Sequence, residues 1–367
     1  MKTFTIIKSL LVVCLVSLIG GGKSAWAQDP VTLASFKNDL SSTEWTTTAV
    51  SYGKNTNLYY KLFKDKYVQS PTIDLTEVAN ISFIIQARSY GSVTEAQKTI
   101  TIQVVPTDVN KTPIVVGTII PKNGDKKTYT TTFENPYKGS GSIRFIALNS
   151  ATSVGAGIYS AIINEAGTFS ITSAGYATYF TDKAFTMPEG VTGSIITDAN
   201  GGSLTIEDKY PAGSVVPAST ALLLKGAEKE YTYNVVRTTE TAPTNNLLHG
   251  SVSQDLTSVN ENTDDYLFYK LSYNEAGDKI GFYWAEDKGA YFVTEGGKAY
   301  LAVPKSQGGA SQMKGFALDG TTTSIQQAST ATATASSIFD INGRRVSTLN
   351  GAAKGVYIVG GKKVMVK

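Results

Sequence analysis

The sequence predicts an all-β protein, and three observations carry that prediction. Threonine, serine, glycine, tyrosine and valine are abundant, a composition typical of strands and turns. Short runs alternate between apolar and polar residues, whereas helical periodicity is scarce. Proline, glycine and asparagine separate these runs. At 367 residues the chain is long enough for two domains and a tail.

The N-terminus has the layout of a secretory signal peptide over residues 1–27. Lysines flank its start, an apolar run covers residues 9–19, and Ala25-Trp26-Ala27 matches the small-residue cleavage pattern. The apolar run is too short to cross a bilayer comfortably. We therefore expect an exported protein whose mature chain begins at Gln28 and has no transmembrane span.

The composition of that mature chain argues against several kinds of site. Residues 1–27 hold three lysines and no acids, so 33 basic and 30 acidic residues become 30 and 30. A neutral chain without a basic block is a poor nucleic-acid binder. The single cysteine, Cys14, is lost with the signal segment, and His249 is the single histidine. The mature chain therefore has no residue for a thiol nucleophile and a single histidine for an imidazole metal cluster or a histidine relay. We expect no cofactor and no metal site.

Residues 28–166 read as a β-sandwich. In the run 58–63, alternation places Tyr59, Lys61 and Phe63 on one face and their apolar neighbours on the other. The run 81–88 alternates in the same way and ends at Arg88. Seven or more such strands between turns favour two sheets that bury their apolar faces against each other. The short polar segment Asn164-Glu165-Ala166-Gly167 is predicted to link this sandwich to the next domain.

Several segments of this domain resemble a known family. They are the early Trp45, "SPTIDL" at 70–75, the strand that ends in Arg88, "GSIRF" with Arg144, and a closing "GIYSAII" at 157–163. Their order is similar to jelly-roll modules of the galactose-binding and choice-of-anchor type. Such modules occur on secreted bacterial proteins and often bind glycans, so the resemblance implies a jelly roll with a glycan as possible partner.

A sugar site needs an aromatic face for stacking beside side chains that bind hydroxyls. Tyr59, Arg88 and Arg144 are predicted to share one exposed sheet face, and Trp45 and Tyr90 to extend it from loops. The alternative is that each residue is structural. Tyrosine is common in strands, and an arginine on a sheet commonly pairs with an acid across the strand.

Residues 167–320 are predicted to form a second β-rich domain that serves as a spacer. Its segments include "YPAGSVVPASTALLLKG" at 210–226 and "GFYWAEDKGAYF" at 281–292. They resemble a module that recurs before the sorting tail in secreted Bacteroidetes proteins, and that resemblance implies no chemistry. We expect its aromatic residues in the core, a hairpin turn rather than a calcium loop at Asp198–Gly202, and a solvated loop position for His249. The acidic pairs at 264–265 and 286–287 are likewise expected in solvated loops.

The last part of the chain is predicted to be a flexible tether followed by a C-terminal sorting signal. Residues 321–337 are rich in threonine, alanine and serine, as in a flexible linker. Residues 338–367 predict two hairpins, the first around Asn342-Gly343. The motifs "FDINGR", "KGVYI" and "KKVMVK" resemble the C-terminal sorting domain of type IX secretion in Bacteroidetes. That resemblance implies secretion and sorting machinery as a partner; the alternative is that these are the last strands of the preceding domain.

Together these observations favour an exported, non-catalytic protein, secreted or on the outer cell surface of a Gram-negative bacterium, that binds a glycan through its first sandwich. The alternative is a structural adhesin or surface-assembly protein without a small ligand. A hydrolase ranks third, because the sequence shows no nucleophile elbow, metal cluster or histidine relay.

Overall fold

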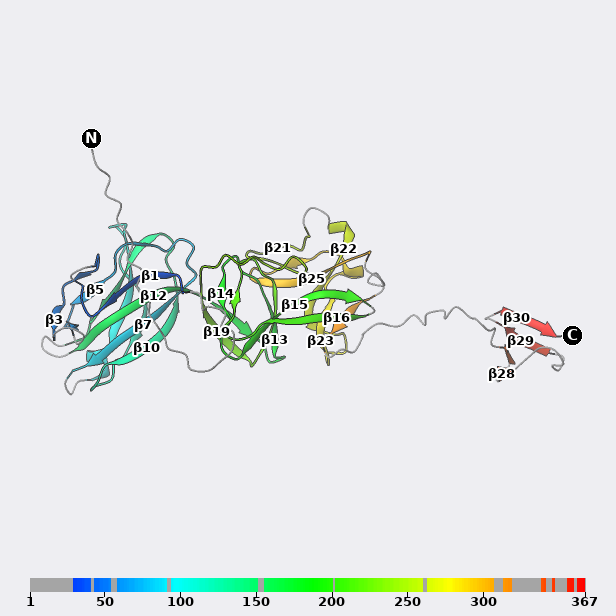
Figure 1. The fold of residues 1–367 in the computed structure, drawn as a ribbon, viewed down its shortest axis with the longest axis horizontal. Helices are drawn as coiled ribbons and strands as arrows, with labels where there is room; N and C mark the ends of the chain where they lie inside the picture. Colours follow the sequence, from blue (N-terminus) through cyan, green and yellow to red (C-terminus); the bar gives the residue numbers. More distant parts are fainter. Residues whose placement is uncertain are drawn as a thin grey trace, which may run out of the picture.

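A computed structural model confirms the all-β class (Figure 1). It describes residues 29–40, 43–53, 58–90, 94–150, 155–200, 202–259, 263–306, 313–318, 338–340, 345–346, 355–359 and 362–366. The expected signal peptide, residues 1–27, and the expected tether, residues 321–337, lie outside the described residues. Within the described residues, short helical turns accompany the strands at α1 (Glu95–Lys98), η2 (Thr263–Asp265) and η3 (Asp287–Gly289).

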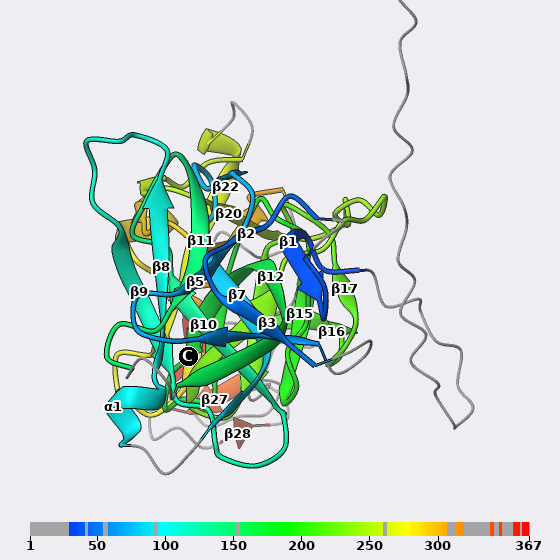
Figure 2. The same ribbon diagram turned by 90° about the vertical axis from the view of Figure 1, so that its left-hand side faces the viewer.

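The first part of the chain forms a jelly-roll-like sandwich of two antiparallel sheets, the N-terminal sandwich. One sheet has the order β10 (Lys127–Glu134), β7 (Asn80–Ser89), β12 (Ala156–Ile171), β4 (Tyr59–Leu62), β3 (Val50–Tyr52), with β1 (Thr32–Lys37) and β19 (Lys229–Asn234) also paired to β12. The other has the order β2 (Thr46–Thr47), β5 (Tyr67–Gln69), β11 (Ser140–Ile146), β8 (Ile100–Pro106), β9 (Ile114–Ile119), with β6 (Ile73–Asp74) on β11. Figure 2 faces this sandwich, with β8 and β9 of the second sheet on one side.

Alternation along the strands creates the core between the two sheets, as the sequence predicts. On β7 the side chains of Ile81, Phe83 and Ile85 are buried, and on β4 those of Tyr60 and Leu62 are buried. They pack against Ile143 and Phe145 of the opposite sheet within one hydrophobic cluster. The remaining side chains of β4 and β7 therefore point away from that core.

One strand runs through the predicted boundary between the two domains. The polar segment 164–167 is not a linker but the middle of the 16-residue strand β12. The first part of β12 pairs with β7 in the N-terminal sandwich, and the part from Ala166 to Ile171 pairs with β19. Because β1, β7 and β19 pair with the backbone along this segment, polar composition alone does not end the strand.

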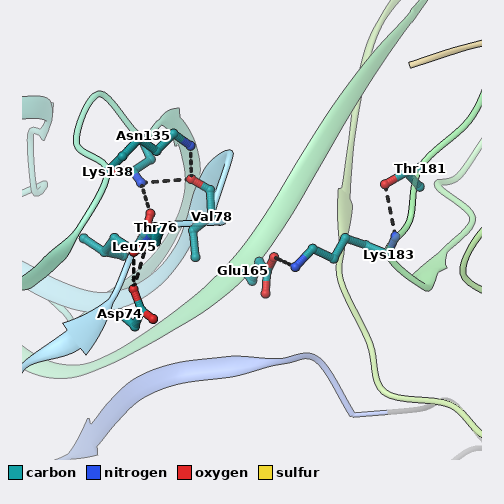
Figure 3. A network of polar contacts seen from close by, with 9 residues as sticks. All are labelled: Asp74, Leu75, Thr76, Val78, Asn135, Lys138, Glu165, Thr181 and Lys183. Carbon is teal, nitrogen blue, oxygen red and sulfur yellow. Dashed lines mark hydrogen bonds and ion pairs between the residues drawn. The ribbon is translucent and has the colours of Figure 1, made fainter. Parts of the chain in front are cut away.

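Side-chain contacts reinforce this junction (Figure 3). The carboxylate of Glu165 on β12 lies 3.4 Å from the ammonium group of Lys183, which follows β13. In the adjoining loop of the sandwich, the Asn135 amide donates hydrogen bonds to the carbonyl oxygens of Leu75 and Val78 at 3.1 and 2.9 Å. Lys138 donates a further bond to the Val78 carbonyl. Strand β12 and the Glu165–Lys183 ion pair join the sandwich to the part that follows, whereas the hydrogen bonds of Asn135 and Lys138 hold the adjoining loop within the sandwich.

The second part is a stack of three β layers, which we call the three-layer region. The first layer is the β12–β19 pair with the short ribbon β14 (Phe185–Thr186) and β17 (Val215–Val216). The middle layer has the order β13 (Tyr176–Tyr179), β18 (Leu222–Gly226), β15 (Val191–Asn200), β16 (Ser203–Tyr210). The third has the order β20 (Leu248–Ser251), β25 (Lys298–Pro304), β22 (Tyr266–Tyr273), β23 (Ile280–Trp284), β26 (Gly315–Ala317), and a ribbon pairs β21 (Asp255–Leu256) with β24 (Val293–Thr294).

Strand β18, inside the middle layer, is buried on both faces along residues 222–224. On β18, Leu222 and Leu224 enter the cluster shared with β12 and β19. Leu223, between them, enters the cluster shared with the third layer. A strand covered on both faces needs apolar residues at consecutive positions, which explains the unbroken run Ala221-Leu222-Leu223-Leu224.

In the three-layer region the structure agrees with the predictions for the 198–202 hairpin and the acidic pairs, and it contradicts the prediction for His249. Strands β15 and β16 pair with Asn200 opposite Ser203, which confirms the hairpin there. Asp264, Asp265, Glu286 and Asp287 are exposed, as expected. His249 is not in a solvated loop: it lies half-buried on β20, with its ring 6.1 Å from that of Tyr300. The strand continues because Leu248 faces the core.

The C-terminal segment folds as the sequence predicts where the structure describes it. Strand β27 (Ile338–Asp340) pairs with β28 (Arg345–Val346), and β29 (Gly355–Val359) pairs with β30 (Lys362–Val366). The four strands form one sheet in the order β28-β27-β29-β30. The turn residues of both hairpins lie outside the described residues.

Candidate functional site

The candidate site lies on the outer face of the seven-stranded sheet. Alternation turns Tyr59 and Lys61 of β4 and Arg88 of β7 away from the core, because their neighbours Tyr60, Leu62 and Ala87 are buried in it. Strand β12 runs between these two strands.

Gly157 of β12 lies in register with Lys61 on one side and with Arg88 on the other. A Cβ atom at this position would come within 2.8 Å of the rings of both Tyr59 and Tyr90. The glycine therefore leaves the room in which two aromatic rings cover the strand.

Four tyrosines form a group on this face, which we call the tyrosine patch: Tyr52, Tyr59, Tyr90 and Tyr159. Tyr59 is its centre, with ring centroids 5.9, 5.2 and 5.0 Å from those of Tyr52, Tyr90 and Tyr159 respectively. Tyr52 faces Tyr59 across the β3–β4 pair and is 40% exposed, whereas Tyr159 is buried beneath the others. The patch is therefore anchored at Tyr159 and open to solvent at Tyr52.

Three cationic side chains lie over the rings of this patch. The Lys61 ammonium group is 5.3 Å from the ring centroids of both Tyr52 and Tyr90. The Arg88 guanidinium carbon is 4.2 Å from the centroid of Tyr90 and 5.9 Å from that of Tyr59. Lys126, in the loop before β10, lies 5.3 Å from Tyr159. Each distance is within the range of a cation–π interaction.

The phenol group of Tyr90 stays protonated at neutral pH. Burial, with hydrogen bonds to the hydroxyls of Tyr159 and Tyr59, raises the pKa of Tyr90 far above its ordinary value. The tyrosines therefore offer apolar ring faces, Tyr90 adds a neutral hydroxyl, and lysine and arginine side chains bring positive charge to the site. The Nε atom of Arg88 is buried and has no hydrogen-bond partner.

Arg144 does not belong to this face, contrary to the sequence-based expectation. It lies on β11 of the other sheet, whose outer face points in the opposite direction. Its Nε atom donates a 2.7 Å hydrogen bond to the side chain of Gln69 across the strand, and its guanidinium group lies 4.4 Å from the ring centroid of Tyr67. Alternation predicts that Arg144 points outward, but it does not say from which of the two sheets.

Trp45 is a core residue and not part of an exposed site. Its side chain is 7% exposed, and its ring centroid lies 4.7 Å from that of Phe36 and 6.3 Å from that of Phe145. The indole N–H donates to the backbone carbonyl of Ser35 at 3.0 Å. The residue precedes β2 outside a strand, as expected, but its apolar ring closes the sandwich core.

The sequence predicts that Tyr59, Arg88 and Tyr90 share one face, and the structure brings these three side chains together there. Sequence reasoning missed Tyr159 as a member of the patch. A register shift between Ile158 and Ser160 in the β12–β7 pairing interrupts regular alternation there. Such a bulge re-aims a side chain and leaves little trace in the sequence.

Two further features of the described chain bear on the site. None of its helices is long and apolar enough to be a membrane-spanning candidate. Across the same residues, histidine, cysteine and acidic side chains do not gather in a group of three or more that could hold a metal ion.

Comparison with known proteins leaves the family open. No family model matches the chain, and no curated protein matches it. Among solved structures the chain is similar to the N-terminal CBM22-1-CBM22-2 tandem domain of Xyn10C from Paenibacillus barcinonensis. The identity is 8%, the TM-score is 0.26, and the match covers 59% of this chain and 100% of that one. At that TM-score the similarity does not define a shared fold.

Proposed function

We propose that this chain is an exported, non-catalytic protein of a bacterial surface that binds a glycan through the tyrosine patch. One observation carries the proposal: Tyr52, Tyr59 and Tyr90 lie together on an outer sheet face with Lys61 and Arg88 among them. The apolar face of a pyranose ring stacks on an aromatic ring, and its hydroxyls bind donors placed beside that ring. Tyr52 is the exposed platform, and Arg88 and Lys61 are the donors.

Binding of the full chain to a broad glycan panel tests this function, with Tyr52→Ala as the main variant. We expect the affinity of the variant to be lower by about tenfold or more, because one stacking platform contributes about 1–3 kcal/mol. Its melting temperature should hardly change, since Tyr52 is an exposed edge residue. Tyr291, 52% exposed on the three-layer region, gives the matched control Tyr291→Ala, which should bind like the wild type.

An unchanged affinity in Tyr52→Ala would place the glycan elsewhere. If the full chain binds none of the glycans, the structural adhesin becomes the better account, because it requires no small ligand.

Export is a separate part of the proposal, supported by the signal-like segment 1–27 and by the paired C-terminal strands. N-terminal sequencing of extracellular protein should begin at Gln28. Deleting residues 336–367 should prevent delivery to the cell surface while the protein still leaves the cytoplasm. Normal surface delivery of the shortened protein would show that residues 336–367 are not a sorting signal.

A further inference from the structure

The tyrosine patch carries positive charge, and within the described residues its cations form no ion pair with a carboxylate. Lys61, Arg88 and Lys126 come from β4, from β7 and from the loop before β10, and all three lie over its rings. Within the described part of the chain, the ion pairs are Lys183–Glu165 and Lys209–Glu207. None of the three cations over the patch therefore pairs with a carboxylate there.

We propose that the ligand of the tyrosine patch is an acidic polysaccharide, one whose sugar units carry carboxylate or sulfate groups. This inference rests on the proposed glycan binding and specifies its ligand class. A neutral sugar needs stacking faces and hydroxyl partners, and unpaired cations add little to either. An anionic group beside a stacked sugar ring would receive charge-assisted hydrogen bonds from Lys61 and Arg88.

The packing around Arg88 supports this assignment. The ring of Tyr90 covers its guanidinium group at 4.2 Å, and its Nε atom is buried without a partner. The rings hold the side chain in place and shield it partly from water, so an anion that reaches it interacts more strongly than it would with a fully solvated arginine. The neutral phenol of Tyr90 adds no repulsion toward that anion.

Arg144 on the opposite sheet shows how an arginine with a structural role is arranged in the same sandwich. It also lies over a tyrosine ring, Tyr67, but its Nε atom donates to the Gln69 side chain. Arg88 has the same aromatic cover and lacks such a partner. The two residues form a matched pair, in which only Arg88 is expected to contact ligand.

The test measures binding of the full chain to polysaccharides that differ in charge alone. Polygalacturonate is compared with its fully methyl-esterified form, and dextran sulfate with dextran. The first pair reports on carboxylates and the second on sulfates. We expect the charged member of at least one pair to bind tenfold tighter or more, and the difference to shrink as salt rises, because ions screen exposed charges.

Variants then locate the binding. Lys61→Gln and Arg88→Gln should each weaken binding of the charged polysaccharide about tenfold to a hundredfold, and Lys61→Arg should retain it. Arg144→Gln is the control for Arg88. Lys111→Gln is the control for Lys61, since Lys111 lies 5.2 Å from the ring of Tyr137 away from the patch. Both controls should bind like the wild type, and a melting curve for each variant verifies folding.

The results of these experiments distinguish the proposal of an acidic ligand from the glycan-binding function on which it rests. Equal binding of charged and neutral members, reduced by Tyr52→Ala but not by Lys61→Gln, would overturn the acidic ligand and keep the glycan site. Losses of the same size in Arg144→Gln or Lys111→Gln would reveal general charge attraction and overturn the assignment to the patch. Binding to neither charged nor neutral polysaccharides would overturn the acidic ligand, and the wider glycan panel then decides the proposed function.

Discussion

The two halves of the molecule differ in where their clustered tyrosines lie. In the three-layer region, Tyr233, Tyr269 and Tyr300 are buried, because β layers pack on each side of the middle sheet and ribbons cover part of the third. In the N-terminal sandwich each sheet has one covered face. Its outer face collects Tyr52 and Tyr59 where solvent and a ligand can reach them. For these residues the layers that cover a sheet face decide burial, and tyrosines at the outer surface of the three-layer region, such as Tyr273 and Tyr291, stay exposed.

The difference also appears in how polar groups are satisfied. The hydroxyls of Tyr179 and Tyr233 in the three-layer region hydrogen-bond to each other, and burial raises the pKa of both. In the sandwich the cations over the tyrosine patch lack a carboxylate partner within the described residues. Buried polar groups need internal partners, whereas an exposed binding face can leave donors for a ligand. Substitutions in the two halves should therefore separate stability from binding.

The largest expected effect is on the inner side of the sandwich. Trp45→Ala should lower the free energy of unfolding by about 3–5 kcal/mol, because it empties a site between Phe36 and Phe145. Protein that remains folded should keep its glycan affinity. Chemical denaturation and a binding assay on the same sample measure both. If the Trp45→Ala protein is stable but no longer binds glycan, Trp45 belongs to the binding site. The distinction between buried structural aromatic residues and exposed binding ones would then be wrong.

Strand β18 offers the sharpest test of burial on two faces. Leu222→Ala and Leu223→Ala should each cost about 2–5 kcal/mol, since their side chains enter different buried clusters. On β4 of the sandwich, Leu62→Ala should cost a similar amount, whereas the outward-facing Lys61→Ala should stay within about 0.5 kcal/mol. Denaturant titration of the four variants gives these values. A small cost for either leucine of β18 would mean that one of the two layers beside it packs loosely.

The shared strand β12 tests whether the two halves are independent. A Cβ atom at Gly167 would lie 2.1 Å from the hydroxyl oxygen of Tyr233, a buried residue of β19 that pairs with Gly167. Gly167→Ala should therefore cost about 1–3 kcal/mol through overpacking. Calorimetry shows which half of the molecule loses stability. If the continuous strand couples the halves, both should melt at lower temperature; a shift confined to one transition would mean that the sandwich unfolds on its own.

Much of this fold could be predicted from local sequence patterns. Alternation correctly places Tyr60, Leu62 and Ile81 inside and Tyr59 and Arg88 outside, because a strand with one covered face imposes a period of two. The C-terminal hairpins follow in the same way from short strands around glycine-containing turns.

The errors arise where contacts between distant segments decide the outcome. Alternation does not say which sheet carries Arg144, nor that the loop residue Trp45 fills the core. The bulge that turns Tyr159 toward the patch depends on pairing with β7. The polar segment 164–167 extends as a strand because β7 and β19 pair with it, and sequence composition does not contain that information.

The smallest expected effect concerns pH and belongs to the three-layer region alone, since His249 is the single histidine of the chain. Partial burial lowers the pKa of His249 below its ordinary value of 6.5 by disfavouring the charged form. In the unfolded chain the imidazole keeps that ordinary value, so below about pH 6.5 the unfolded state binds the proton more readily than the folded state. Stability from this group is therefore complete above pH 6.5 and falls as the pH drops toward the folded-state pKa.

The measurement is the free energy of unfolding at pH 7.5 and 5.5 for the wild type and for His249→Gln. Because the variant has no imidazole, the part of the pH dependence due to His249 should disappear and its stability should change less between the two values. His249 lies against Tyr300 within the third layer, so the change should accompany the unfolding of that region and leave the tyrosine patch intact. An identical pH dependence in both proteins would mean that the folded and unfolded chains protonate His249 equally, and that the ring is more solvated than its place on β20 indicates.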